Sequence, residues 1–287
     1  MKLLTIAVCG LTLAAVAAPT ASLAPIAIGS DAFDASFGHI QGACCSEDAI
    51  YLTQMKCLYK FDWSGKLLKK KSVISHTGDI CFWQGEIYTS VAVYGGPNKG
   101  KGMIQVFDQE LNLVRETLID RSTDGITILD GVLYLGMGAN HVPSKEAHRE
   151  NLVGRFDPKT LKPLGERQII DFGYVTNYGI QDISNDGKHV LCAFYSAKKG
   201  QPNFIVFDKD WKVVRADCTY YASNGFDRLP ARFGGENPRF LRVKTVRPPK
   251  NKAAPKAARK LSVMIDFFEW ADGKAVDITK KQAETKE

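Results

Sequence analysis

The segment Leu58–Lys71, LYKFDWSGKLLKKK, contains the repeat from which the fold of this chain can be predicted. An alternating strand leads into a Phe-Asp corner, a tight turn and a second strand, a pattern typical of a β-hairpin. The same layout returns at Ile104 (IQVFDQELNLVRET), Val153 (VGRFDPKTLKPLGE), Phe204 (FIVFDKDWKVVRAD) and, most diverged, Met264 (MIDFFEWADGKAV). The corner acids Asp62, Asp108, Asp157, Asp208 and Glu269 are 46, 49, 51 and 61 residues apart. This spacing indicates an array of repeated units.

A second repeat precedes each hairpin and completes the unit. It reads GACCSEDAIYLT from Gly42, GDICFWQGEIYTS from Gly78, GITILDGVLYLG from Gly125 and GIQDISNDGKHVLCA from Gly179. Each copy predicts a short apolar inner strand, a polar turn and a second strand. Five units of four antiparallel strands predict an all-β fold, a five-bladed β-propeller. The fifth inner strand is expected near Gly225–Arg232, and Pro25–Ser30 is a candidate partner for closing the ring.

One residue type recurs at the same point of each hairpin and predicts the core. These residues, expected to pack between the sheets, are Phe61, Phe107, Phe156, Phe207 and Phe268.

The N-terminus has the pattern of a secretory signal peptide. Lys2 precedes a largely apolar run, and small residues offer cleavage near residue 18 or 24. The run is shorter than the roughly 20 residues that span a bilayer, and no other segment predicts a membrane span. We therefore expect a signal peptide at 1–24, one propeller domain at 25–280 and a polar tail at 281–287. The expected location is secreted or periplasmic.

Six cysteines follow the signal segment, an even number that permits disulfides in an oxidising compartment. The sequence has no Cys-x-x-Cys and no zinc-type Cys/His spacing, so structural thiols or disulfides are expected rather than a metal site. The predicted disulfide lies within the group Cys44, Cys45, Cys57 and Cys81, or joins Cys192 to Cys218.

The long connections are expected on the face where the inner strands begin, and they are basic. They include YGGPNKGKG, MGANHVPSKEAHREN, YSAKKGQPN and a low-complexity basic loop at 247–260, within a chain of formal net charge +7. Long loops on a rigid scaffold often carry function, and a basic rim favours polyanionic partners. The alternative is a solvated surface that only maintains solubility. Nucleic acid is not an expected partner, since no known binding motif is present.

The residues around the start of each inner strand should converge on the axis. Their polar side chains are His39, Gln41, His76, Asp79, Asp124, Asn177, Tyr178, Gln181, Asp182, Asn224, Asp227 and Arg228. Among them the carboxyl groups of Asp79, Asp124 and Asp182, at or near the entry glycines of three blades, are the candidate catalytic residues; the others are candidate substrate-binding residues. The alternative is a water-filled channel whose polar groups bond only to one another or hold an ion.

Carboxylates held close together cannot all ionise easily, so one can serve as an acid while another serves as a base. Such a pair can hydrolyse a glycosidic bond or, in the manner of an aspartic protease, an amide. The sequence lacks the nucleophile elbow of serine hydrolases, the zinc-protease helix motif, the phosphate-binding loop and the dinucleotide-binding fingerprint. No cofactor or metal is therefore expected, although calcium on the axis stays open because Asp oxygens suit it.

Through GHIQG (38–42), SHTGDICFWQGEIY (75–88) and the repeated Phe-Asp elements, the chain resembles secreted bacterial five-bladed β-propellers. Related architectures include glycoside hydrolases with axial carboxylates, glutaminyl-cyclase-like enzymes and sugar-binding lectins, and HIQG is similar to the opening of the cyclase-like group. The resemblance implies a fold rather than an activity.

Residues and resemblance together predict a secreted, monomeric hydrolase that acts on an extracellular glycoprotein, such as a mucin, or on an acidic polysaccharide. The alternative is a non-catalytic propeller that binds glycans or proteins through the same face.

Overall fold

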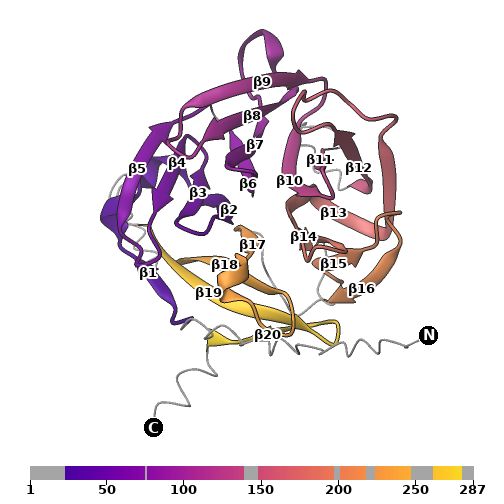
Figure 1. Ribbon diagram of the computed structural model, residues 1–287. Helices are drawn as coiled ribbons and strands as arrows, with labels where there is room; N and C mark the ends of the chain where they lie inside the picture. The colour runs from indigo at the N-terminus through magenta and orange to yellow at the C-terminus, as the bar shows by residue number, and fades with distance from the viewer. Residues whose placement is uncertain are drawn as a thin grey trace, which may run out of the picture.

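The computed structural model describes residues 23–74, 76–138, 148–196, 201–217, 224–246 and 261–279. Within these residues the chain forms β-strands almost throughout, and the strands are arranged as five blades around a central axis (Figure 1). The predicted all-β, five-bladed propeller with four antiparallel strands per blade is confirmed.

The first two blades are separate four-stranded sheets. Blade one consists of β2 (Ile40–Cys45), β3 (Ile50–Gln54), β4 (Cys57–Phe61) and β5 (Leu67–Ser72). Blade two consists of β6 (Thr77–Trp83), β7 (Glu86–Ala92), β8 (Gly102–Asp108) and β9 (Leu113–Ile119). In both blades each strand pairs with the next strand in the chain, from the axis outward (Figure 1).

Blades three and four are joined by one long strand, β13 (Gln168–Asn185), which makes them a continuous seven-stranded sheet. Its first part is the outer strand of blade three, beside β10 (Thr123–Leu129), β11 (Val132–Met137) and β12 (His148–Phe156). Its last part is the inner strand of blade four, beside β14 (Val190–Ser196), β15 (Phe204–Phe207) and β16 (Val213–Asp217).

Blade five closes the ring with strands from both ends of the chain. From the axis outward, its first three strands are β17 (Phe226–Arg228), β18 (Arg239–Val246) and β19 (Ser262–Ala271). The outer edge of β19 pairs with two short strands, β1 (Ile26–Ile28) near the N-terminus and β20 (Lys274–Asp277) near the C-terminus. The expected inner strand near residue 225 and the closing role of residues 25–30 are both found.

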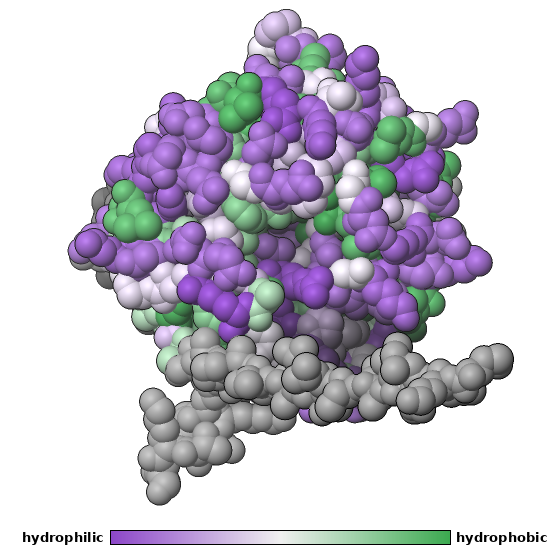
Figure 2. Space-filling view, in the orientation of Figure 1, coloured by the Kyte–Doolittle hydropathy of each residue, from purple (hydrophilic) through white to green (hydrophobic). Residues whose placement is uncertain are grey.

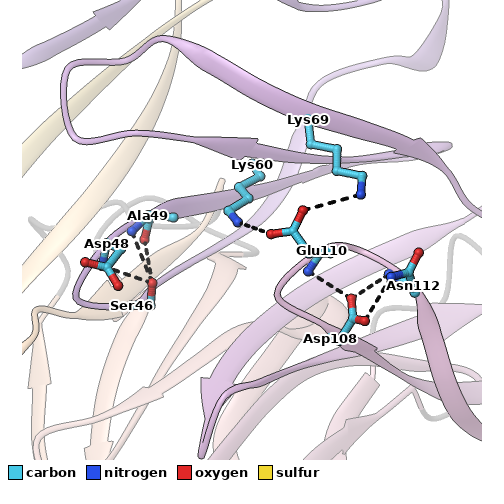
Figure 3. Close-up of polar contacts among 8 residues, drawn as sticks. All are labelled: Ser46, Asp48, Ala49, Lys60, Lys69, Asp108, Glu110 and Asn112. Atoms are coloured by element: carbon cyan, nitrogen blue, oxygen red, sulfur yellow. Dashed lines mark hydrogen bonds and ion pairs between the residues drawn. The ribbon is translucent and has the colours of Figure 1, made fainter.

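The repeated Phe-Asp corner forms the same turn in blades one, two and four, and a turn one residue longer in blade three. In blade two, the Asp108 carboxylate accepts hydrogen bonds from the backbone N–H groups of Glu110 and Asn112, both at 2.8 Å (Figure 3). Asp62, Asp157 and Asp208 each bond to backbone N–H groups of their own turns. These side chains replace water as partners for the turn backbone, which explains why an Asp recurs there. In blade five Glu269 pairs instead with Arg239, at 3.7 Å.

Apolar side chains between neighbouring sheets make up the core. The five repeated phenylalanines are all buried, at 5% exposure or less. Polar contacts at the rim also cross between blades: Glu110 of blade two lies between Lys60 and Lys69 of blade one, at 2.8 and 3.5 Å (Figure 3). The surface seen in Figure 2 is mainly hydrophilic, with hydrophobic residues in small separate groups.

The predicted disulfide among Cys44, Cys45, Cys57 and Cys81 is wrong in this structure, where these four residues and Cys192 are buried free thiols. Cys44 and Cys45 are adjacent in β2, so they point to opposite faces and pack in different core clusters. Cys45 and Cys57 share a cluster, but Cys45 pairs with one end of β3 and Cys57 with the other. Strand geometry therefore separates the Cys45 sulfur atom from those of Cys44 and Cys57.

Several predictions concern residues outside the described ranges, namely the signal peptide, the basic loop at 247–260, the tail at 281–287 and Cys218. The described ranges also contain four short 3₁₀ helices: η1 (Ser30–Ala32), η2 (Ala35–Phe37), η3 (Gly96–Asn98) and η4 (Ala231–Phe233). In the part of the chain that the structure describes, no helix has the length and apolar character needed to cross a membrane.

Candidate functional site

The five inner strands β2, β6, β10, β13 and β17 surround the axis (Figure 1), and glycines let them approach closely. A Cβ atom placed on Gly42 would lie 2.5 Å from the Cα atom of Asp79, and one on Gly78 would lie 2.8 Å from Asp124 Oδ1. Only glycine fits at such contacts. The repeated glycines thus place the carboxylate of one blade against the inner strand of the blade before it.

Asp79 connects three blades. Its side chain extends from β6, and Oδ2 accepts hydrogen bonds from the backbone N–H of Ile126 in β10, at 3.0 Å, and of Ile183 in β13, at 2.9 Å. The residue is fully buried, and Oδ1 has no hydrogen-bond partner. Burial raises the pKa of Asp79, while the two N–H donors act in the opposite direction.

Asp182 is the least satisfied polar group on the axis. It is fully buried in β13, and neither of its carboxyl oxygens accepts a hydrogen bond of normal geometry, although the Gly225 backbone N–H acts to lower its pKa. Burial raises its pKa well above the ordinary value, and the nearby charges of Asp79 and Asp124 raise it further. Since Asp79 has N–H donors that favour its ionised form, Asp182 ionises less readily than Asp79.

Asp124 lies nearer the start of its strand, at the second position of β10, and is 7% exposed. Its Oδ2 accepts a hydrogen bond from Gln181 Nε2 at 3.1 Å. Burial raises the pKa of Asp124 to about 7, and the Gln181 bond acts against this rise. A carboxyl group with this pKa can give or take a proton near neutral pH.

Asp227 and Arg228 lie toward the other end of the axis. Asp227 Oδ2 accepts a hydrogen bond from the Cys45 N–H at 3.1 Å, and Oδ1 accepts one from Ser184 Oγ at 3.0 Å. Cys45 is the last residue of β2, and Ser184 is the last but one of β13. Burial raises the pKa of Asp227 to about 7. These two predicted site residues are therefore not grouped with Asp124.

The remaining predicted residues are distributed around the strand starts. His39 Nε2 lies 3.2 Å from Gln41 Nε2, and the His76 ring meets the Tyr94 ring edge-on at 5.2 Å. Asn224 Oδ1 accepts a hydrogen bond from Thr245 Oγ1 at 3.3 Å, so it stays close to its own blade. The side chains of Asn177 and Tyr178 lie outside those that the structure describes.

Ser184 and the Cys45 backbone were not among the predicted site residues. The sequence does carry a signal for the different position of Asp227, which lies two residues after its inner-strand glycine, whereas Asp79 and Asp124 lie next to theirs. In a strand, a change of offset by one residue moves a side chain to another face and level. For Asp182 this signal fails, because β13 has register shifts before it.

Among the described residues, no group of three or more His, Cys, Asp or Glu side chains is placed to hold a metal ion.

The sequence matches no protein family and no curated protein at a significant level. Its fold is similar to that of the Bacteroides ovatus xyloglucan PUL GH43B protein, with a TM-score of 0.59 and 13% identity over 88% of this chain and 56% of the other. Myxococcus xanthus glutaminyl cyclase is similar at a TM-score of 0.53 and 10% identity, over 88% and 95% of the two chains. A bifunctional GH43-CE protein from Bacteroides eggerthii gives 0.55 and 12%, over 89% and 36%.

The chain thus spans about half and about a third of the two GH43 proteins. At these identities the similarities establish a fold shared with bacterial propellers, and the chemistry has to be argued from the residues. Asp124 is therefore a candidate acid near the start of the inner strands, next to the buried carboxyl pair Asp79 and Asp182.

Proposed function

We propose that this protein is a hydrolase of an extracellular polymer, with the glycan chains of a glycoprotein or an acidic polysaccharide as the substrate class. The observation that carries the proposal is the set of three axial carboxyl groups from successive blades, one of which, Asp124, is slightly exposed and has a pKa of about 7. The propeller fold shared with GH43 glycosidases and a glutaminyl cyclase supports a hydrolase or a binding role.

In the proposed reaction Asp124 is the acid. Near neutral pH part of the Asp124 population is protonated and can donate its proton to the oxygen of the leaving sugar. A second carboxyl group takes a proton from the attacking water, so that water is added across the bond. Asp79 is our choice for this role, because its two N–H donors favour its ionised form, its Oδ1 accepts no hydrogen bond, and Asp124 Oδ1 lies against the neighbouring Gly78.

The burial of Asp79 and Asp182 sets the direction of access. Both are fully buried, whereas Asp124 is 7% exposed. Water and substrate must therefore approach from the Asp124 side. Through Oδ2, Asp79 also bonds to the backbone of β10 and β13, which holds the neighbouring carboxyl-bearing strands in place.

Export is part of the same proposal. The apolar N-terminal run and its small residues support a signal peptide, which would bring the protein to secreted or periplasmic glycans. The basic residues expected in the long loops, such as Lys99 and Lys101, support an acidic partner.

A non-catalytic binding propeller is the second candidate, and the bonding of Asp79 favours it. A carboxylate that accepts two backbone N–H groups from other blades has a structural use that needs no reaction. In that case the axial carboxyl groups hold the blades together, and the loop face binds glycan without cleaving it.

Incubation of the purified protein with a mucin-type glycoprotein distinguishes the two candidates. Mass spectrometry of the products would detect both peptide and sugar cleavage. The hydrolase proposal predicts new fragments with the wild-type protein and none with Asp124→Asn. Asp210→Asn is the matched control, because Asp210 lies in the exposed turn between β15 and β16 and should leave activity unchanged. Retention of the glycoprotein without any new product would support the binding propeller.

A further inference from the structure

One connection between first and second strands is much longer than the others. β10 and β11 are joined by two residues, and so are β6 and β7, whereas β17 and β18 are joined by the ten residues Leu229–Pro238. This loop lies at the end of the axis where the inner strands finish, on the face opposite the long basic loops. An added segment of this length on a rigid scaffold is a candidate binding element.

The loop is fixed to blade one. Phe233 packs on Trp63, with ring centroids 4.3 Å apart, and the Arg232 guanidinium lies over the Trp63 ring at 5.4 Å and pairs with Glu47 at 3.5 Å. Within the loop region, Arg239 Nη1 donates to the Phe233 carbonyl oxygen at 3.2 Å. These contacts hold the loop as a wall across the mouth of the channel.

A cavity of about 570 Å³ lies between this wall and the ends of the inner strands. This is the size of a pocket for a small molecule, such as one or two sugar units. Its lining includes Asp227, Arg228, Phe82 and Ile128. An aromatic ring and apolar groups therefore stand beside ionisable ones, a combination suited to sugar rings.

Some of the charged side chains that line the cavity already form ion pairs within the protein. Glu47 pairs with Arg232, and Arg239 contacts Glu269. By contrast, the Arg228 side chain is exposed: its guanidinium lies against Gly187 and makes no side-chain hydrogen bond or ion pair with the described part of the chain. A planar guanidinium without a partner is well suited to a carboxylate, which it can bind with two parallel hydrogen bonds.

Asp227 can recognise hydroxyl groups. Its Oδ1 accepts a hydrogen bond from Ser184 Oγ, and its Oδ2 accepts one from the Cys45 N–H and a long one from Cys45 Sγ. Since a carboxylate has about four acceptor positions, further donors can bind to it from the cavity. Asp227 and the exposed Glu236 also oppose a doubly charged ligand such as a phosphate monoester.

We propose that this cavity is a second ligand site, separate from the axial Asp124 group, and that it binds a small hydroxylated monocarboxylate of the sugar-acid class. Arg228 binds the carboxylate, Asp227 accepts from hydroxyl groups, and Phe82 covers one face of the ring. The site does not depend on the proposed hydrolase activity, because it lies at the other end of the axis.

Isothermal titration with D-glucuronate, D-glucose and glucose 6-phosphate tests the site. Glucuronate should bind saturably to the wild-type protein and more tightly than the other two sugars. Arg228→Gln should weaken glucuronate binding by at least about tenfold, since a charge-assisted hydrogen bond contributes about 1.5 to 3 kcal/mol. Arg228→Lys keeps the charge but not the paired geometry and should lose less.

Two control variants separate the site from general charge effects and from the axial group. Lys188→Gln removes a positive charge from the exposed turn between β13 and β14, outside the cavity lining, and should leave glucuronate binding unchanged. Asp124→Asn should also leave it unchanged, whatever its effect on hydrolysis. Saturable binding that is equal in wild type and Arg228→Gln would overturn the proposal. The absence of saturable glucuronate binding to the folded wild-type protein would overturn it as well.

Discussion

The pKa of Asp124 makes the stability of this protein depend on pH in a predictable direction. The folded pKa is about 7 and the ordinary value is 3.8. The folded state therefore binds a proton more tightly than the unfolded state. The stabilising contribution is fully present below pH 3.8 and is lost as pH rises through about 7. Raising the pH from 5 to 8 should thus lower the free energy of unfolding.

The size of this effect follows from the same two values. One pKa unit corresponds to about 1.4 kcal/mol, so the whole difference amounts to about 4 kcal/mol for this one group, of which about 2.5 kcal/mol falls between pH 5 and pH 8. Asparagine at this position cannot ionise, and its amide oxygen can still accept from Gln181. Asp124→Asn should therefore lose this share of the pH dependence and gain stability relative to wild type at pH 8.

Urea unfolding measured at several pH values between 4.5 and 8, for wild type and Asp124→Asn, checks the prediction. The exposed turn residues Asp62 and Asp108 have lowered pKa values, so their opposite contribution falls below this range. Asp210→Asn should keep the wild-type pH dependence. An identical pH dependence in wild type and Asp124→Asn would show that Asp124 ionises normally, and the argument for it as an acid near neutral pH would fail.

Three further predictions concern the core, the thiols and the basic face. Phe61→Ala should cost about 3 to 5 kcal/mol in urea unfolding, because Phe61 is fully buried against Phe33, whereas Leu113→Ala, at 48% exposure, should cost less than about 0.5 kcal/mol. The native protein should show no disulfide among Cys44, Cys45, Cys57, Cys81 and Cys192 in non-reducing peptide mapping, and these buried thiols should react with a thiol reagent only on unfolding; rapid reaction of the native thiols would contradict their burial. Raising the salt concentration should reduce capture of an acidic glycan but leave turnover of a short neutral substrate nearly unchanged, and equal effects on both would argue against a basic rim.

The fold could be predicted from the sequence because each blade repeats the same local requirements. A Phe must fill the space between sheets and an Asp must satisfy the turn backbone, so both recur at fixed positions such as Phe107 and Asp108. The pairing of both β1 and β20 with the outer edge of blade five could be predicted only in part, because β1 has three residues and does not carry the repeat. The disulfide prediction failed because composition does not say which strand face each cysteine occupies.

The candidate site was predictable to a lesser degree. Asp79, Asp124 and Asp182 could be selected because each lies close to an inner-strand glycine. The burial of their side chains could not be predicted, because it depends on backbone groups of other blades. Examples are the Ile126 and Ile183 N–H groups that bond to Asp79. The loop Leu229–Pro238 and its cavity were not predicted, because the long basic loops pointed to a binding site on the opposite face.

Hydrolysis by the axial carboxyl groups can be tested in one experiment. The most direct measurement compares product formation from a mucin-type glycoprotein by wild type, Asp124→Asn and Asp210→Asn, with thermal unfolding of each protein recorded in parallel. If Asp124 is the acid, wild type and Asp210→Asn should release new sugar or peptide fragments, Asp124→Asn should lose at least about a hundredfold in product formation, and all three proteins should keep an intact fold. Equal product formation by a folded Asp124→Asn protein would contradict that role.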